Sequence, residues 1–290
     1  MVKIIRERKA IYDEVQKLKA AGKKVGFVPT MGALHEGHLS LIRSSVKEND
    51  VTIVSIFVNP IQFNQASDFE NYPITPDEDL AKLEANNCDL LFLPSQNEMY
   101  PEGLETDNDF NPGYLGEILE GAYRPGHFQG VATIVKKLFD ATNPDLAYFG
   151  QKDYQQLLIV QKLVKDYELN IEIKQGAICR EPEGLAISSR NVRLTNDQRK
   201  WAPEIYQTLL KAKQALRSKD ISTVKHEALK QLNEIPEAKA EYFEILNAQD
   251  LTNFEANELP ETIVICATVW LGEVRLIDNI LVKANEAYAN

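Results

Sequence analysis

Two histidines stand three residues apart in segment 28–38, where an apolar run ends and a turn of small residues follows. His35 and His38 are two of only four histidines in the chain, so a pair of loop residues without a role is the weaker explanation. An imidazole can donate a hydrogen bond to a phosphate oxygen and stabilise the charge that builds up as pyrophosphate leaves. The segment has neither a Walker A nor a GxGxxG pattern. It predicts a nucleotide site of another kind, and a metal site is less favoured because no third ligand stands nearby.

Two further segments carry groups suited to phosphate. Lys152 is a compact cation and Asp153 can accept hydrogen bonds from a ribose, although a helix N-cap beside a solvated lysine explains both residues equally well. Ser188, Ser189 and Arg190 supply two hydroxyls and a guanidinium, which together could clamp a β,γ-phosphate through charge-assisted bonds. Such a triplet also occurs by chance in many loops, so it indicates a phosphate site only in combination with the other segments.

Polar residues that could hold the rest of a substrate lie between these segments. Asn59 and Gln62 carry amides, which bind hydroxyl and carboxylate groups without acting as nucleophiles. An Asx turn before proline explains Asn59 but not Gln62. Glu78 and Asp79 could help to hold Mg²⁺ beside a triphosphate, and they would equally suit the N-terminus of a helix.

The elements that must position these residues alternate up to about residue 178. Strands are expected at 24–29, 51–58, 89–94, 146–150 and 171–178, and helices at 38–48, 77–86, 131–141 and 154–167. Near-continuous apolar strands joined by helices predict an α/β fold with a doubly wound parallel sheet. Ligands of such sheets bind at the carboxyl ends of strands, facing helix N-termini. Ahead of the third helix, Arg124 and His127 lie in a constrained loop that is either a pocket wall or a plain turn.

The pattern changes after about residue 190. Helices are expected at 196–218 and 223–233, and strands at 241–246, 262–269 and 274–277, with a turn at 271–273. A smaller α+β domain therefore follows a boundary near residues 180–190, which we place so that the domains are 1–185 and 186–290.

Composition excludes several classes of protein. The formal net charge of −11 disfavours nonspecific binding to nucleic acid or to anionic membranes. No apolar run approaches the ~20 residues of a membrane helix. The charged start of the chain continues into a helical pattern and does not resemble a signal peptide, so a cytoplasmic location is expected. Cys88, Cys179 and Cys266 are odd in number and far apart, which favours buried thiols over disulfides or a zinc site.

Taken together, seven segments resemble the pantoate–β-alanine ligase family of the HxGH nucleotidyltransferase superfamily. They are PTMGALHEGH (29–38), FVNPIQF (57–63), YPITPDEDL (72–80), YRPGHFQGVAT (123–133), FGQKDYQQL (149–157), GLAISSRN (184–191) and LGEVRLIDN (271–279). Their order and spacing run through nearly the whole chain, which makes the resemblance far more specific than any single motif.

The resemblance implies a Rossmann-like N-terminal catalytic domain that binds ATP and pantoate, a smaller C-terminal lid domain, and a homodimer. It implies a ligase that uses ATP and Mg²⁺ to join (R)-pantoate to β-alanine. Pantoate would attack the α-phosphate of ATP, and β-alanine would then attack the pantoyl adenylate, releasing AMP. The chemistry agrees with the residues, because ATP activates the acid and the protein needs only to position and stabilise charge.

The resemblance also implies residue roles. ATP contacts would fall on Met31, Gly32, Ala33, Leu34, His35, Glu36, Gly37, His38, Gly150, Gln151, Lys152, Asp153, Cys179, Ile187, Ser188, Ser189 and Arg190. His38 would be the proton donor, and the other expected catalytic residues are His35, Lys152, Ser188, Ser189 and Arg190. Substrate contacts would fall on Gln62, Gln156, Asn59, Pro29 and Thr30, and metal contacts on Asp79 and Glu78.

Four positions depart from the commonest family pattern. Gln151 stands where Glu is frequent, Cys179 where Val is frequent and Ile187 where Met is frequent. Glu78 stands where Asp is often found. Two rival functions are weighed against the ligase: another HxGH-type nucleotidyltransferase that stops at the nucleotide adduct, and a non-catalytic nucleotide-binding protein. The paired amides Gln62 and Gln156 argue against the first rival, and the retained phosphate-binding groups argue against the second.

Overall fold

The computed structural model describes residues 1–64, 69–107, 109–255 and 258–283. The chain divides into two compact units, one of Met1–Gln151 with Gln155–Ala177 and one of Lys152–Tyr154 with Ile178–Asn290. The boundary, placed from the sequence between residues 185 and 186, thus falls at Ala177 in the structure. In addition, a three-residue segment ahead of it groups with the C-terminal unit.

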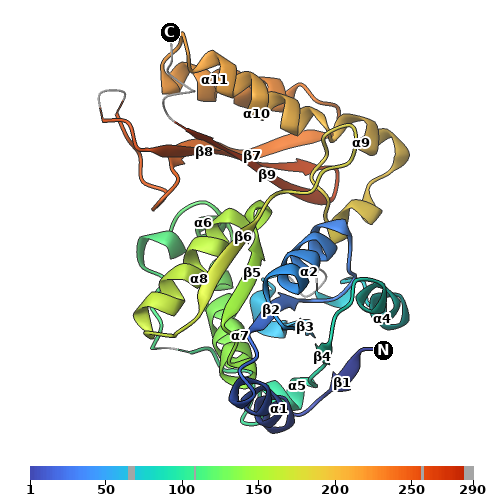
Figure 1. Cartoon of the computed structure of the whole chain (residues 1–290). Coiled ribbons are helices and arrows are strands. Elements are labelled where there is room, and N and C mark those ends of the chain that lie inside the picture. The colour runs from blue at the N-terminus through green and yellow to red at the C-terminus, as the bar shows by residue number, and fades with distance from the viewer. Residues whose placement is uncertain (65–68, 108, 256–257, 284–290) are drawn as a thin grey trace. The chain divides into compact units, whose positions relative to one another are not determined.

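A six-stranded parallel sheet forms the centre of the N-terminal unit (Figure 1). Its strands, in sheet order, are β1 (Lys3–Ile5), β4 (Leu90–Phe92), β3 (Val51–Ile56), β2 (Val25–Thr30), β5 (Leu146–Gly150) and β6 (Glu172–Gly176). After β2 the chain adds β3 and β4 on one side and β5 and β6 on the other. The strand order therefore reverses between β2 and β5, which is the position where open α/β sheets bind ligands.

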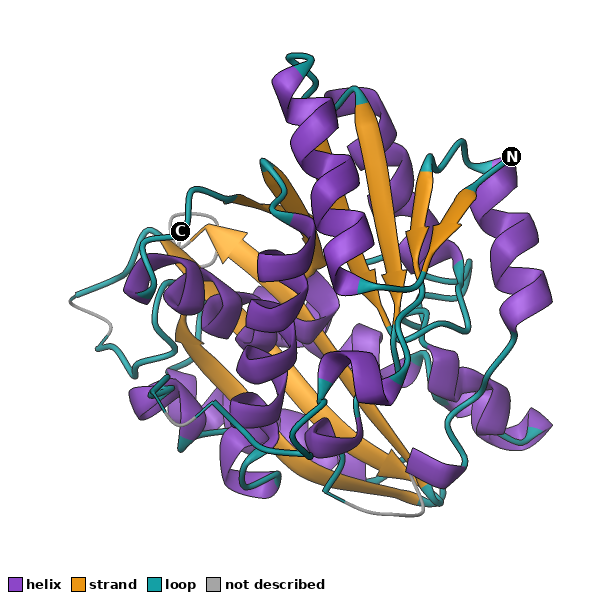
Figure 2. Cartoon of the chain, turned by 90° about the horizontal axis from the view of Figure 1, so that it is seen from below, coloured by secondary structure: helices purple, strands orange, loops and turns teal. Residues whose placement is uncertain are grey.

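Helices cover both faces of this sheet (Figure 2). They are α1 (Arg8–Ala20), α2 (Glu36–Glu48), α4 (Pro76–Ala85), α5 (Gln96–Met99), α6 (Glu120–Tyr123), α7 (His127–Thr142) and α8 (Tyr154–Asp166), with short 3-10 turns η1 (Pro60–Gln62), η2 (Gly113–Gly116) and η3 (Gln151–Asp153). Successive strand residues point to opposite faces of the sheet. Val28 and Val54 pack with α2 and α4 on one face. Phe27 points to the other face, where its ring centroid lies 6.3 Å from that of Phe139 in α7. The doubly wound α/β fold predicted from the sequence is confirmed.

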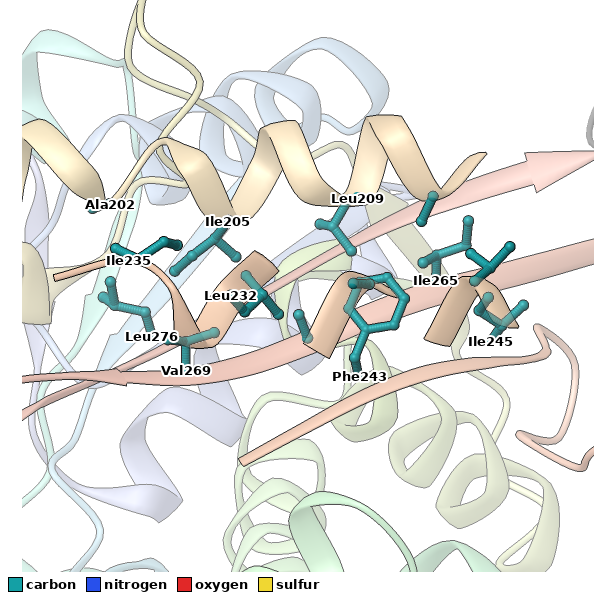
Figure 3. Close-up of a cluster of buried hydrophobic side chains, with 14 of the residues drawn as sticks. Ala202, Ile205, Leu209, Leu232, Ile235, Phe243, Ile245, Ile265, Val269 and Leu276 are labelled. Carbon is teal, nitrogen blue, oxygen red and sulfur yellow. The ribbon is translucent and has the colours of Figure 1, made fainter. Parts of the chain in front are cut away.

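The C-terminal unit contains an antiparallel sheet of β7 (Ala238–Asn247), β8 (Thr262–Leu271) and β9 (Val274–Lys283). Its helices are η4 (Ser189–Arg193), α9 (Asn196–Trp201), α10 (Glu204–Ala215) and α11 (Ile221–Asn233). Figure 3 shows Ile205 and Leu209 of α10 and Leu232 of α11 pointing toward Phe243 and Ile265 of the strands. All five side chains are almost fully buried, so this unit has a hydrophobic core of its own.

Several elements differ from the sequence predictions. No strand was expected at the charged start of the chain, yet it holds the edge strand β1, in which only Ile5 is buried, ahead of α1. The helix expected at 196–218 is divided into α9 and α10, because Pro203 lacks the N–H that a continuous helix would need there. α7 begins at His127 rather than at 131, after Gly126 in a left-handed conformation (φ +80°). Among the described residues, no helix has both the length and the apolar content needed to cross a membrane.

Candidate active site

The turn that follows β2 is shaped by two residues with positive φ. Thr30 ends the strand, donates its hydroxyl to the carbonyl of Ser55 (2.8 Å) and accepts the N–H of Gly32 (3.2 Å). Gly32 and Ala33 have φ of +85° and +47°. A Cβ on Gly32 would also lie 3.1 Å from an Asp79 oxygen, so both backbone conformation and space favour glycine there.

Helix α4 holds this turn in place. The Asp79 carboxylate accepts the N–H of Ala33 (2.9 Å) and of Leu34 (2.7 Å), and its side chain is almost fully buried. One helical turn later, Lys82 donates to the carbonyl of Leu34 (2.8 Å). The exposed Glu78 lies 3.8 Å from Lys82. In this structure Asp79 therefore anchors the turn, a role that was not predicted from the sequence.

His35 and His38 lie together at the start of α2. Their rings stack with centroids 4.0 Å apart and an interplanar angle of 21°. The His38 Nδ1 accepts the backbone N–H of His35 at 3.4 Å, so a neutral His38 carries its proton on Nε2 and can donate it to an anion. A Cβ on Gly37 would come within 3.0 Å of the His35 ring, which explains the glycine between the two histidines. The first N–H groups of a helix add a partial positive charge at the same place.

The neighbouring strands bring further predicted residues to the same edge of the sheet. β2 pairs with β3 up to Thr30 and Ile56, so Asn59 and Gln62 follow at the adjoining strand end. The Asn59 Nδ2 donates to the Gln62 Oε1 at 3.4 Å. On the other side of β2, β5 ends at Gly150, and Gln151 accepts a hydrogen bond from Gln175 (3.2 Å).

Two consecutive glutamines at the start of α8 differ in surroundings. Gln155 is buried and donates to the carbonyls of Leu115 and Ile118 (2.7 and 2.9 Å), so its role is structural. Gln156, the residue expected to bind substrate, is half-buried. Adjacent side chains in an α-helix point about 100° apart, so Gln155 can face the interior while Gln156 faces another direction.

Within the C-terminal unit, Lys152 is held by a buried asparagine. The Asn279 Nδ2 donates to the Lys152 carbonyl at 3.0 Å, and Tyr154 donates to the carbonyl of Ala248 at 2.8 Å. The Lys152 ammonium lies 3.9 Å from the exposed Asp153. These bonds explain why Lys152–Tyr154 group with this unit rather than with the strand that precedes them.

The segment that carries the predicted clamp folds back on itself in the same unit. Ile187 donates its N–H to the carbonyl of Cys179 (2.9 Å), and Arg180 and Ala186 form an isolated bridge. Arg180 makes a two-bond ion pair with the buried Asp278 (2.6 and 2.8 Å). Ile187 thus leads directly into η4, which starts where the Ser188 hydroxyl accepts the N–H of Arg190 (3.3 Å).

The predicted residues are therefore divided between the units. The N-terminal unit contains Pro29, Thr30, Met31, Gly32, Ala33, Leu34, His35, Glu36, Gly37, His38, Asn59, Gln62, Glu78, Asp79, Gly150, Gln151 and Gln156. The C-terminal unit contains Lys152, Asp153, Cys179, Ile187, Ser188, Ser189 and Arg190. Three further residues contact site residues: Lys82, Tyr100 and His127. Of these, only His127 was singled out in the sequence, because of its position in a constrained loop.

Comparison with known proteins settles the family. The pantoate–β-alanine ligase family model matches residues 3–281. The chain belongs to the pantoate–β-alanine ligase family. A pantothenate synthetase of Bacteroides thetaiotaomicron is 46% identical over 282 residues, covering 97% of this chain and 99% of that protein. The family resemblance seen in the seven sequence segments is thereby confirmed.

Solved structures of the pantoate–β-alanine ligase family share the fold. The pantothenate synthetase of Thermus thermophilus has a TM-score of 0.86 and 38% identity, covering 99% of this chain and 100% of that one. The pantoate–β-alanine ligase of Francisella tularensis, solved in complex with β-γ ATP and β-alanine, has a TM-score of 0.79 and 37% identity, covering 97% and 98%. The similarity therefore spans the whole chain rather than the nucleotide-binding part alone.

Proposed function

We propose that this chain condenses (R)-pantoate with β-alanine to give pantothenate, with ATP converted to AMP and pyrophosphate. The observation that carries the proposal is the pair of stacked imidazoles at the start of α2, placed beside the reversal of strand order in a full-length member of this ligase family. A nucleotidyltransferase that stops at the adduct would share the imidazoles, but relatives covering nearly the whole chain are ligases.

The first step joins pantoate to AMP. A carboxylate oxygen of pantoate attacks the α-phosphorus of ATP, and the bond from that phosphorus to pyrophosphate breaks. Negative charge grows on the phosphate oxygens, and the His38 Nε2–H is the donor that the geometry makes available to them. The stacked ring of His35 keeps His38 in this orientation. Lys152, Ser188, Ser189 and Arg190 would hold the leaving phosphates through charge-assisted bonds.

The second step forms the amide. The unprotonated amine of β-alanine attacks the acyl carbon of pantoyl adenylate, the bond from that carbon to the AMP oxygen breaks, and the amine loses a proton. The adenylate is already activated, so positioning is the main contribution of the protein. Gln62 and Gln156 are proposed to bind pantoate, with Asn59, Pro29 and Thr30 around it, and the segments 31–38, 150–153, Cys179 and 187–190 are proposed to bind ATP.

The proposed Mg²⁺ would enter with ATP rather than in a site built by the protein. Both oxygens of Asp79 already accept backbone N–H groups, and Glu78 is exposed beside Lys82. Within the described ranges, no group of three or more His, Cys, Asp or Glu side chains could hold a metal ion. The Asp79 carboxylate is thus already engaged in holding the turn, and no step is assigned to Asp79 or Glu78.

The reaction is tested by measuring AMP release from ATP, Mg²⁺ and pantoate, with and without β-alanine, together with mass analysis of the product. Pantothenate and AMP should appear only when both substrates are present. Adenylate that accumulates without amide formation would favour the nucleotidyltransferase instead. ATP binding with no turnover would favour a non-catalytic nucleotide-binding protein.

His38 is tested by substitution. His38→Ala should slow adenylate formation by about 10²–10⁴-fold with the fold intact, because it removes a donor that acts in the transition state. His226 is an exposed histidine of α11, so His226→Ala is the matched control and should leave the rate unchanged. An equal rate for both variants would remove His38 from the mechanism.

We also propose a cytoplasmic homodimer, because the reaction consumes ATP and the family resemblance implies a dimer. Sedimentation analysis of the purified chain tests the dimer, and a monomer that retains full activity would overturn it.

A further inference from the structure

A closed group of hydrogen bonds surrounds Asn59 in the N-terminal unit. Tyr100, which follows α5, donates its hydroxyl to the Asn59 Oδ1 at 2.7 Å. The Asn59 Nδ2 donates to the carbonyl of Gly130 in α7 at 3.1 Å and to the Gln62 Oε1 at 3.4 Å. Asn59 and Tyr100 are 1% and 5% exposed, so water has little access to these bonds.

Hydrogen-bond chemistry permits one orientation of the Asn59 amide. The Gly130 carbonyl can only accept, so the Asn59 atom that faces it must be Nδ2. The Asn59 Oδ1 then faces Tyr100, whose hydroxyl must donate. Burial raises the pKa of Tyr100, which keeps that proton on the hydroxyl at all ordinary pH values.

The orientation of Asn59 in turn determines that of Gln62. The second hydrogen of the Asn59 Nδ2 points at the Gln62 side chain, which must present its oxygen there because two NH₂ groups would repel. With Oε1 turned toward Asn59, Gln62 presents its Nε2 donor on the other side. A donor is the group that a carboxylate or hydroxyl oxygen of a hydroxy acid requires.

Two further contacts hold the main chain of Gln62. The His127 Nδ1 lies 2.8 Å from the Gln62 carbonyl, so this nitrogen carries a proton and donates it. A Cβ on Gly130 would lie 2.5 Å from the Ile61 carbonyl oxygen, so the first turns of α7 pack directly against η1. His127 and Gly130 lie one helical turn apart and act on the same three-residue segment.

We propose that Tyr100 and His127 are positioning residues that present the Gln62 amide, NH₂ outward, to the hydroxy acid. Tyr100 acts through Asn59 on the side chain, and His127 acts on the main chain. The inference rests on the proposed function, because it assumes that Gln62 binds pantoate. Because both residues act through Gln62, substitution of either should affect the use of pantoate and not the use of ATP.

The first test removes the Tyr100 hydroxyl alone. In Tyr100→Phe the buried Asn59 Oδ1 loses its hydrogen-bond donor, which loosens the amide that holds the Gln62 side chain. The KM for pantoate should therefore rise about 10-fold while the KM for ATP changes less than about twofold. Tyr148→Phe is the matched control, because it also removes a buried hydroxyl, bonded to Asn49 and Glu48. The control should leave both constants unchanged, and a thermal melt of each variant verifies its fold.

The second test combines Tyr100→Phe with Gln62→Ala. If Tyr100 acts through Gln62, the double variant should have the same KM for pantoate as Gln62→Ala alone. If the rise in the KM for pantoate in the double variant instead equals the product of the two single rises, the inference is overturned. His127→Asn keeps a donor near the Nδ1 position and should stay within about threefold of the unchanged enzyme, whereas His127→Leu should raise the KM for pantoate about 10-fold.

The outcomes separate the inference from the proposed function. If the unchanged enzyme makes no pantothenate, the proposed function fails and the inference fails with it. If pantothenate forms but Gln62→Ala leaves the KM for pantoate unchanged, the reaction stands and the inference is overturned. If Gln62→Ala raises that constant while Tyr100→Phe behaves like Tyr148→Phe, the substrate site stands and the positioning role is overturned.

Discussion

Asp79→Asn should weaken the fold around the turn after β2 without changing how much Mg²⁺ the enzyme needs. The carboxylate accepts two backbone N–H groups, from Ala33 and Leu34, at 2.9 and 2.7 Å, and the residue is 1% exposed. Asparagine keeps one acceptor oxygen and turns a donor toward the other N–H. One of the two N–H groups then has no acceptor, next to a conformation that already requires positive φ at Gly32.

The size of the effect follows from those bonds. A buried donor without its partner costs about 1–3 kcal/mol, and a hydrogen bond to a charged group contributes about 1.5–3 kcal/mol. We therefore expect Asp79→Asn to lower the free energy of unfolding by about 2–4 kcal/mol. In a unit of this size that corresponds to a fall in melting temperature of about 4–16 °C. The rate of adenylate formation should fall as well, since the turn leads directly into His35.

The assay compares Asp79→Asn with Glu78→Gln, which removes the same charge from the adjacent, exposed position. Thermal melts measure stability, and pyrophosphate release is followed while Mg²⁺ is raised at constant ATP. Asp79→Asn should melt lower and keep the Mg²⁺ dependence of the unchanged protein, and Glu78→Gln should match that protein in both measurements. Unchanged stability combined with a several-fold higher Mg²⁺ requirement in Asp79→Asn would refute the anchoring role and favour a metal ligand.

Three further predictions follow from buried or capping side chains. Asn279→Ala should raise the KM for ATP about 3–10-fold, because the Lys152 main chain loses its hydrogen bond, and an unchanged value would contradict this link. Cys88 should resist alkylation at pH 8 in the folded protein, since burial raises the pKa of its thiol to about 12; rapid labelling detected by peptide mass analysis would contradict this. Hydrogen bonds from Ser222 and Thr223 lower the pKa of Asp220, the N-cap of α11, so Asp220→Ala should melt below the unchanged protein at pH 7. That difference should narrow as the pH falls below the ordinary Asp value of 3.8, because the unfolded chain then takes up a proton at Asp220 that the folded state resists; a constant difference would count against it.

The elements around His35 and His38 could be predicted because their signals are local. An apolar run that ends in small residues, followed by helical periodicity, marks β2 and α2 without knowledge of any distant residue. The same signals failed for β1, which has three residues and is stabilised by its pairing with β4, 87 residues further along the chain. They also failed for the start of α7, where Pro125 and Gly126 resemble a loop.

The contacts that give the site its shape could not be predicted in this way. Asp79 meets Leu34 across 45 positions, and Tyr100 meets Asn59 across 41. Nothing in the composition of either segment indicates its partner, because a buried tyrosine or a helix-terminal aspartate has many possible uses. Residue types therefore indicated which groups could bind a phosphate, and the tertiary fold determined which groups hold them in place.

The grouping of Lys152–Tyr154 with the C-terminal unit has a consequence for attempts to cut this protein in two. The backbone passes from one unit to the other three times, at Gln151–Lys152, Tyr154–Gln155 and Ala177–Ile178. A gene fragment that starts at Ile178 would therefore encode Asn279 without the Lys152 carbonyl that it binds. The complementary fragment would carry Lys152 and Tyr154 without their partners. Neither half is therefore a self-contained piece for fusion or exchange.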